Sequence, residues 1–128
     1  MTILDSNVWI AYAYEEDSQH EKAVQIFDLL TPSLVLPEYI LIETCTVLTS
    51  RAGKRVADIF LDRALNNRDV LLLYADQKFF DSVISRYRRR DDRFLSFIDV
   101  SLFVLSQSYH VITFDKKLEK AMTEQRHT

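Results

Sequence analysis

Two aspartates stand at the ends of predicted strands, where side chains that perform chemistry are often found. Asp5 directly follows the apolar run Thr2–Leu4, and Asp115 directly follows the run 111–114. Open sheets of parallel strands place their ligands just beyond the carboxyl ends of the strands. If these two strands are near neighbours, the two carboxylates converge on one site. The alternative is that each aspartate only caps the helix that follows it, a common role for this residue.

Glu43 is the only charged residue between Tyr39 and Ser50. On the predicted helix its neighbours three and four residues away include Ile40 and Val47, so the acid lies on a mostly apolar face. A carboxylate buried there costs several kcal/mol unless it is paired or binds a metal ion, and nothing within the helix pairs with it. An exposed acid at a rim, or an acid paired with a distant arginine, is the alternative.

Asp99 is likewise isolated, with no other charge between Phe94 and Ser108. One interpretation is electrostatic: Ser96 is the N-cap of a predicted helix, and a carboxylate three residues later interacts favourably with the helix dipole. An acid at the start of a helix can also face a crevice, so the two roles are compatible.

The candidate catalytic and metal-binding residues are therefore Asp5, Glu43, Asp99 and Asp115. Brought together without a cation, these carboxylates would repel one another, and some would stay protonated. A hard divalent cation such as Mg²⁺ or Mn²⁺ removes that conflict, because these ions bind oxygen ligands and need few protein carboxylates. Such ions can activate water, orient a phosphodiester and stabilise the leaving oxygen. With one glycine, the chain has no glycine-rich phosphate-binding loop.

The elements that must position these acids follow from alternating short apolar runs and amphipathic segments. Strands are expected at residues 2–4, 34–36, 70–73 and 111–114. Helices are expected at residues 7–14, from a capping box at Ser18 towards Pro32, from Pro37 to about 51 with Gly53 as its stop, from about 54 to 66, from Asp76 to about 89, from Ser96 onward, and at 116–123. Strands separated by helices pair in parallel through crossovers. The fold class is therefore α/β, with a central parallel sheet of four to five strands and helices on both faces.

The length and composition fit one globular domain spanning residues 1–128. Of the 128 residues, 48% are apolar and 27% charged, which is too apolar for intrinsic disorder. No apolar run approaches roughly 18 residues, the length that spans a bilayer, and the first residues lack the basic start of a signal peptide. The single cysteine, Cys45, excludes an internal disulfide. We therefore expect a cytoplasmic protein without a membrane segment.

Charge is unevenly distributed along the chain, whose formal net charge is −3. Residues 1–50 contain one basic residue, Lys22, and eight acids, whereas residues 51–93 contain eleven basic residues and seven acids. Such asymmetry can mark a nucleic-acid partner, although charged helix faces are usually only solvated.

Taken in order, the acidic segments resemble those of PIN-domain nucleases, and within that family those of the VapC-like toxins of type II toxin–antitoxin systems. The matching segments are Leu4-Asp5-Ser6-Asn7-Val8, the lone Glu43, Leu95-Ser96-Phe97-Ile98-Asp99, and Ile112-Thr113-Phe114-Asp115 followed by Lys116. Each segment is short, but their order, their spacing and the total length match, so the resemblance covers nearly the whole chain.

The resemblance implies a PIN-like three-layer sandwich whose acids bind Mg²⁺ or Mn²⁺ and hydrolyse RNA. Carried over by motif, Ser6 and Asn7 would orient the first aspartate, and the Thr113 hydroxyl would support the site. Ile98 stands where relatives often carry threonine, so polar support from that position is lost. Asp92 fits an additional acid that some relatives carry seven residues before the third one.

The same resemblance implies partners. The substrate would be RNA, and the candidate phosphate contacts are Arg86, Arg88, Arg89, Arg90, Arg93 and Lys116. A solvated helix end is the other interpretation of this basic run. Family toxins usually form homodimers and are held inactive by a small antitoxin protein. The main alternative function is a catalytically weak PIN-fold module that binds RNA or serves as a scaffold, and a haloacid-dehalogenase-type phosphatase is disfavoured because it needs an acid where Asn7 stands.

Overall fold

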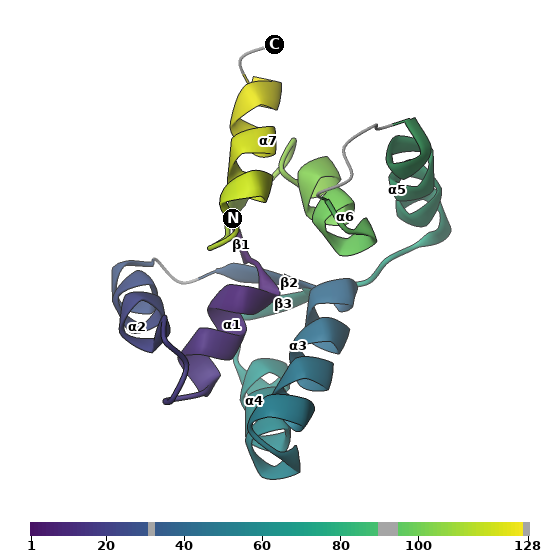
Figure 1. Ribbon diagram of the computed structural model, residues 1–128. Helices are drawn as coiled ribbons and strands as arrows, with labels where there is room; N and C mark the ends of the chain where they lie inside the picture. The colour runs from purple at the N-terminus through teal and green to yellow at the C-terminus, as the bar shows by residue number, and fades with distance from the viewer. Residues whose placement is uncertain (31–32, 90–94, 127–128) are drawn as a thin grey trace.

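The sheet at the centre of the molecule has four parallel strands in the part of the chain that the structure describes (Figure 1). A computed structural model describes residues 1–30, 33–89 and 95–126. The strands are β1 (Thr2–Leu4), β2 (Leu34–Pro37), β3 (Val70–Leu73) and β4 (His110–Ile112). Their order is β3-β2-β1-β4, so the first and last strands are neighbours, and Ile3 lies opposite both Val35 and Val111. The predicted parallel sheet of four to five strands is confirmed, with four strands in these ranges.

Helices cover both faces of the sheet. They are α1 (Ser6–Ala13), α2 (His20–Leu29), α3 (Glu38–Arg51), α4 (Lys54–Asn66), α5 (Gln77–Arg89), α6 (Phe97–Leu105) and α7 (Lys116–Arg126). Figure 1 shows α1 to α4 on one face and α5 to α7 on the other, and the contacts among helices follow the same division. The predicted α/β class is therefore confirmed. A membrane-spanning helix is not found among the described residues, since none there combines the length and the apolar character that a span requires.

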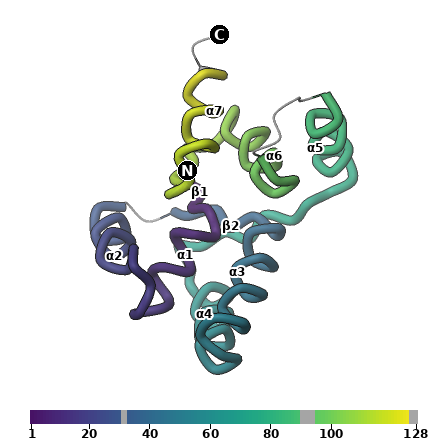
Figure 2. Tube along the Cα trace, in the orientation of Figure 1, coloured from purple at the N-terminus to yellow at the C-terminus, as the bar shows by residue number. Residues whose placement is uncertain are grey.

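The chain builds the sheet outward from β1 in two directions, as the tube in Figure 2 traces. It runs from β1 to β2 and β3 with α1 to α4 as connections, then returns through α5 and α6 to β4 on the other side of β1. Because parallel crossovers are right-handed, this reversal moves the later helices to the opposite face. Open α/β sheets bind ligands where the strand order reverses, beyond the carboxyl ends of the two strands. Asp5 directly follows β1, and Asp115 lies three residues beyond the end of β4.

The core lies on both faces of the central strands. Ile3 and Val35 are fully buried, as expected for strands covered by helices on both sides. On the α1 side, the Trp9 ring meets Phe27 and Phe60 edge-on, with centroids 5.3 and 5.5 Å apart. The strand that ends at Asp5 is therefore surrounded by close-packed side chains.

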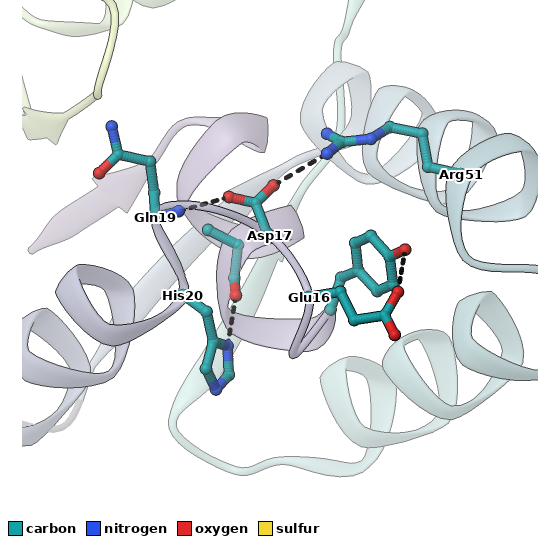
Figure 3. A network of polar contacts seen from close by, with 7 residues as sticks. Glu16, Asp17, Gln19, His20 and Arg51 are labelled. Carbon is teal, nitrogen blue, oxygen red and sulfur yellow. Dashed lines mark hydrogen bonds and ion pairs between the residues drawn. The ribbon is translucent and has the colours of Figure 1, made fainter.

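The predicted capping box at Ser18 is wrong. Helix α2 begins at His20, its N-cap is Gln19, and no side chain caps it. Instead, the Gln19 amide donates to Asp17 Oδ1 at 2.8 Å, and Arg51 at the end of α3 donates to Asp17 Oδ2 at 3.3 Å (Figure 3). An aspartate that accepts the amide two residues later forms a turn of its own, and here the ion pair with Arg51 also ties that turn to α3.

Other boundaries shift for local reasons. Pro37 is the last residue of β2 and the N-cap of α3, in extended geometry, rather than the first helical residue. Gly53 has a φ of 98° and its amide donates to Leu48 O, so it ends α3 as predicted and also serves as N-cap of α4. Strand β4 ends at Ile112, before the predicted boundary. Pro32, which was expected to end α2, lies outside the described residues.

Candidate active site

Asp5 is held by hydrogen bonds on both of its carboxylate oxygens. Its own amide donates to Ile112 O of the neighbouring strand at 2.9 Å. Oδ1 accepts from the Ser6 amide at 2.6 Å, where it caps α1, and Oδ2 accepts from the Thr113 hydroxyl at 2.7 Å. The residue is 4% exposed. Groups at the start of α1 and in the segment after β4 therefore fix this carboxylate.

A second set of hydrogen bonds fixes Thr113. Asn7 Nδ2 donates to Thr113 Oγ1 at 3.2 Å, and Asn7 Oδ1 accepts from the Phe114 amide at 3.2 Å. The Asp115 amide also donates to Thr113 Oγ1, at 3.0 Å. Because that oxygen accepts two hydrogens, its own hydrogen is directed to Asp5. The structure thus brings Thr113 to Asp5 directly, and Asn7 through Thr113.

Glu43 reaches the same place from α3. It is half-buried, and its Oε1 accepts from the Ser6 hydroxyl. That hydroxyl also lies 3.4 Å from Asp5 Oδ1, so Ser6 stands between the two carboxylates. Helices α1 and α3 pack together, which brings residues 37 positions apart into contact.

Asp115 caps a helix, and Asp99 lies three residues after the N-cap Ser96, as their alternative interpretations predict. Asp99 Oδ2 accepts from the Ser96 amide at 3.0 Å, while Ser96 Oγ accepts from the Asp99 amide at 3.1 Å, which forms a capping box on α6. Asp115 Oδ1 accepts from the amides of Lys117 and Leu118 at 2.9 and 3.4 Å, at the start of α7. Within the described ranges, these caps use one oxygen of each carboxylate, and no protein group donates to the other.

The four acids influence one another electrostatically. Burial is the main cause that raises the pKa of Asp5 from 3.8 to about 6, hydrogen bonds to its carboxylate oppose the rise, and the charges of Asp99 and Glu43 add to it. Burial also raises the pKa of Asp99, and the charge of Asp115 adds to that rise. The candidate acids therefore form one group of interacting charges.

No basic residue in the described ranges forms an ion pair with any of these acids. In the same ranges, no three His, Cys, Asp or Glu side chains are arranged as a preformed metal-binding group. The donors nevertheless fit a hard divalent cation, because all are carboxylate oxygens and Mg²⁺ binds through one or two carboxylates while keeping several waters. The oxygens of Asp99 and Asp115 that cap no helix, and the raised pKa of Asp5, fit such an ion.

The predicted phosphate contacts differ in exposure. Arg86 is half-buried, with its guanidinium 4.8 Å from the centre of the Phe103 ring, between α5 and α6. An arginine stacked in this way contributes packing rather than an open phosphate contact. Arg88 and Arg89 are exposed in the last turn of α5, and Lys116 is exposed at the first position of α7.

Other predicted residues contribute less to the described site. Arg90, Asp92 and Arg93 lie outside the described residues. Ile98 is half-buried in the first turn of α6, and its carbonyl accepts from the Ser101 hydroxyl at 2.6 Å. Its apolar side chain adds no hydrogen bond to the acids, as its residue type predicts.

One cation near the acids was missed by the sequence interpretation. Lys22 on α2 places Nζ 5.1 Å from the centre of the Phe114 ring, and Phe114 stands between Thr113 and Asp115 in the chain. Lys22 is exposed and forms no ion pair with any described residue. The available signal was that it is the only basic residue among the first 50. Its contact depends on where α2 lies relative to β4, which the sequence pattern does not state.

Comparison with known proteins agrees with this architecture. The family model described as PIN domain matches residues 2–122, and among curated proteins none matches this chain. The crystal structure of the VapC20 toxin of Mycobacterium tuberculosis, described as a sarcin–ricin loop cleaving toxin, matches with a TM-score of 0.86 and 22% sequence identity, over 94% of this chain and 95% of that one. At this identity, the structural match concerns the fold. The family match covers nearly every residue, from the start of β1 into α7. The chain therefore belongs to the PIN domain family.

Proposed function

We propose that this chain is a metal-dependent endoribonuclease in which Asp5, Glu43, Asp99 and Asp115 bind a divalent cation and catalyse hydrolysis of RNA phosphodiester bonds. The observation that carries the proposal is the state of Asp5. It is buried and hydrogen-bonded on both oxygens, burial and then the charges of other acids raise its pKa, and no described basic residue forms an ion pair with it. Such perturbed, uncompensated acids are typical of functional sites.

The chain's own groups would hold the site before substrate binds. The Ser6 amide and the Thr113 hydroxyl fix the oxygens of Asp5, and the Ser6 hydroxyl holds Glu43 beside it. Glu43 would bind the cation or position the attacking water. Asp99 and Asp115 would bind through the oxygens that cap no helix. When bound, Mg²⁺ or Mn²⁺ would supply an activated water and stabilise the leaving oxygen, with a 5′-phosphate and a 3′-hydroxyl as the products.

RNA is the proposed substrate for two reasons. The structurally similar VapC20 is described as cleaving the sarcin–ricin loop, and from that description we extend only the class of substrate, a structured RNA. Exposed basic residues also flank the acids: Lys116 follows Asp115 directly, and Lys22 lies over Phe114. They would neutralise backbone phosphates, together with Arg88 and Arg89 at the end of α5. Arg90 and Arg93 stay predictions from the sequence.

A toxin role would add partners. We propose a small antitoxin protein as inhibitor, a homodimer as the active assembly, and the cytoplasm as the place of action. The support is the resemblance of the acidic segments to VapC-like toxins, together with the shared fold. Copurification with the product of the adjacent gene, followed by a mass measurement with and without that product, tests both partners.

One observation favours a second function, that of a PIN-fold RNA-binding or scaffold module without turnover. Asp99 and Asp115 both have structural roles as helix caps, and the described residues contain no preformed metal-binding group. A scaffold that kept these acids only as caps would bind no Mn²⁺ at Asp5. Metal binding therefore separates the two functions.

The test is cleavage of a labelled pool of structured RNA by the purified chain, with Mg²⁺ or Mn²⁺, with a chelator, and by Asp99→Asn. Asparagine keeps an oxygen that can accept the Ser96 amide, so the capping bond survives while the charge is lost. Asp81→Asn, on the exposed surface of α5, is the matched control. We expect cleavage by the wild type and the control, and none with the chelator or with Asp99→Asn.

Two results would contradict this function. Cleavage by Asp99→Asn at the wild-type rate in the presence of a chelator would show that the acids do not catalyse the reaction. Absence of cleavage, combined with absence of any stabilisation by Mn²⁺, would favour the scaffold instead.

A further inference from the structure

A cavity of about 180 Å³ lies beyond the carboxyl ends of β2 and β3, the two strands that are not followed by a candidate acid. Pro37, which ends β2, and Leu73, which ends β3, both line it. None of the four candidate acids does. The nuclease proposal therefore leaves this cavity without a role.

Aromatic rings and carboxylates supply the chemistry of the cavity. The lining residues of these two kinds are Tyr39, Tyr74, Phe79, Tyr109, Glu38 and Asp76. The ring centroids of Tyr39 and Phe79 are 6.0 Å apart. Tyr74 is 70% exposed, so the cavity is open to solvent beside this residue. No basic residue lines the cavity among the described residues.

Both carboxylates are fixed by backbone amides through one oxygen each. Glu38 Oε1 accepts from the Ala75 amide at 2.9 Å, and Asp76 Oδ1 accepts from the Phe79 amide at 2.8 Å. Neither acid forms an ion pair with a described residue. Burial raises the pKa of Tyr39, and the charge of Glu38 adds to that rise. The lining therefore combines negative charge with aromatic surface.

The size and sign of the cavity restrict its ligand. Pockets for drug-sized molecules and cofactors usually measure about 300–1,000 Å³, so a nucleotide does not fit in about 180 Å³. Phosphate groups are disfavoured by the two acids. Cations are favoured twice, by the carboxylates and by the negative faces of aromatic rings. An apolar stem would also replace water against Leu73 and Leu105, which line the cavity too.

We propose that this cavity binds an organic cation, an alkylammonium group on a short aliphatic stem. Tyr39, Tyr74, Phe79 and Tyr109 surround the stem and the head group, and Glu38 and Asp76 compensate the charge with the oxygens that accept no backbone amide. The same chemistry is supplied by a free small amine and by the lysine side chain of a partner protein. This proposal does not depend on the nuclease function.

The first test is a titration followed by backbone amide NMR, with n-butylammonium as the probe and n-butanol as its neutral match. We expect saturable shifts at the amides of Ala75 and Phe79, because both donate to the acids of the cavity. The neutral probe should bind at least about tenfold more weakly than n-butylammonium. Equal binding of the two probes, or shifts that do not include these amides, would overturn the proposal.

Charge-neutral variants test the carboxylates without unfolding the cavity. Glu38→Gln and Asp76→Asn each keep an oxygen for the amide that they accept, and each should weaken n-butylammonium about threefold to tenfold. Tyr74→Leu removes the exposed ring and should also weaken binding, whereas Asp81→Asn on α5 should leave it unchanged. Wild-type affinity in both carboxylate variants would contradict the proposal.

The source of the cation is decided by a second pair of probes. A capped Ala-Lys-Ala peptide that binds about tenfold more tightly than n-butylammonium indicates the lysine of a partner protein. Equal or weaker binding of the peptide indicates a free amine. A change in RNA cleavage on adding either probe is not required, so failure here leaves the nuclease proposal intact, and failure of the nuclease proposal leaves this one intact.

Discussion

Two largely buried carboxylates, Asp5 and Asp17, are held in similar ways but differ in how their charge is compensated. Each lies just before a helix and accepts the amide of a residue that follows, at 2.6 Å for Asp5 and 2.8 Å for Asp17. The second oxygen of Asp17 binds the Arg51 guanidinium at 3.3 Å (Figure 3). The second oxygen of Asp5 binds a neutral hydroxyl, that of Thr113, at 2.7 Å. Hydrogen bonding is thus similar at both sites, and a cation is present at one of them.

The two acids differ in whether a cation of the chain itself compensates their charge. The rise of the Asp5 pKa from 3.8 to about 6 corresponds to about 3 kcal/mol by which the fold disfavours the charged carboxylate. Asp17 has its cation within the chain, so its role is complete once the loop before α2 is tied to α3. Asp5 is placed by hydrogen bonds and has no ion-pair partner among the described residues, which fits the metal site proposed above.

The largest expected effect is that of Asp5→Asn on the proposed reaction. Loss of a group next to a metal ligand typically costs 10- to 100-fold, so loss of a ligand should reduce RNA cleavage more than about 100-fold. In the wild type, Mn²⁺ at about 100 times its Kd should stabilise the fold by about 2.7 kcal/mol, a rise in Tm on the order of 10 °C. Asp5→Asn should lose that rise. Cleavage rates and calorimetry with and without Mn²⁺ measure the two effects.

Retention of the full Mn²⁺ response by Asp5→Asn would place the metal elsewhere. The same measurements on Asp17→Asn provide the control, because that variant also replaces one carboxylate oxygen of a largely buried aspartate with an NH₂ group.

Thr113→Val should have the next largest effect. The substitution removes the hydroxyl that donates to Asp5 Oδ2. It also removes Thr113 Oγ1, the acceptor of the side-chain amide of Asn7. Cleavage should fall about 10- to 100-fold, mainly in kcat, since the position of Asp5 changes while the phosphate contacts do not. Thr113→Ser keeps the hydroxyl and should restore most of the rate. A Ser variant as poor as the Val variant would show that shape, rather than the hydrogen bond, matters at this position.

The placement of the acids shows how far sequence reasoning extends. That Asp5 directly follows a parallel strand was predictable from a short apolar run that stops at an acid, whereas the same pattern placed the end of the last strand too late, because β4 ends at Ile112 and Asp115 lies three residues beyond it. Their proximity needed the strand order, in which β4 lies beside β1, and no local pattern states that order. Ser96 as N-cap, with Asp99 three residues later, was predicted correctly because the cap is a local pattern, and the structure adds the reciprocal bond that makes it a capping box.

Contacts between distant elements were the ones that sequence patterns did not supply. The bond between Ser6 and Glu43 depends on how α1 and α3 pack. In the same way, a run of arginines does not reveal that Arg86 turns towards Phe103. Ser18 was mistaken for a cap because Asp17, one residue earlier, has both a stronger acceptor and a cation in Arg51.

A smaller effect is expected from pH in the absence of metal. The folded-state pKa of Asp5 lies above its ordinary value of 3.8, so the native state binds this proton more tightly than the unfolded state. Stability from this group is fully present below about pH 4 and is lost as pH rises through about 6. Between about pH 5 and 7 the wild type should lose about 1 kcal/mol relative to Asp5→Asn. Urea unfolding of both proteins with a chelator measures this difference, and a wild type that gains stability over this range relative to the variant would contradict it.

Asp17→Asn should have the smallest effect: it should lower the free energy of unfolding slightly, whereas Asp5→Asn should not lower it at neutral pH. Asparagine keeps an oxygen for the Gln19 amide but loses the ion pair with Arg51, which is 50% exposed and therefore worth less than about 1 kcal/mol. The variant should be destabilised by up to that amount, with RNA cleavage and the Mn²⁺ response unchanged. At neutral pH without metal, Asp5→Asn relieves a buried charge and should be no less stable than the wild type. Both substitutions remove one negative charge and keep one acceptor oxygen. Changes of opposite sign in the free energy of urea unfolding would trace the difference to Arg51. Changes of the same sign would show that the two acids contribute to stability in the same way.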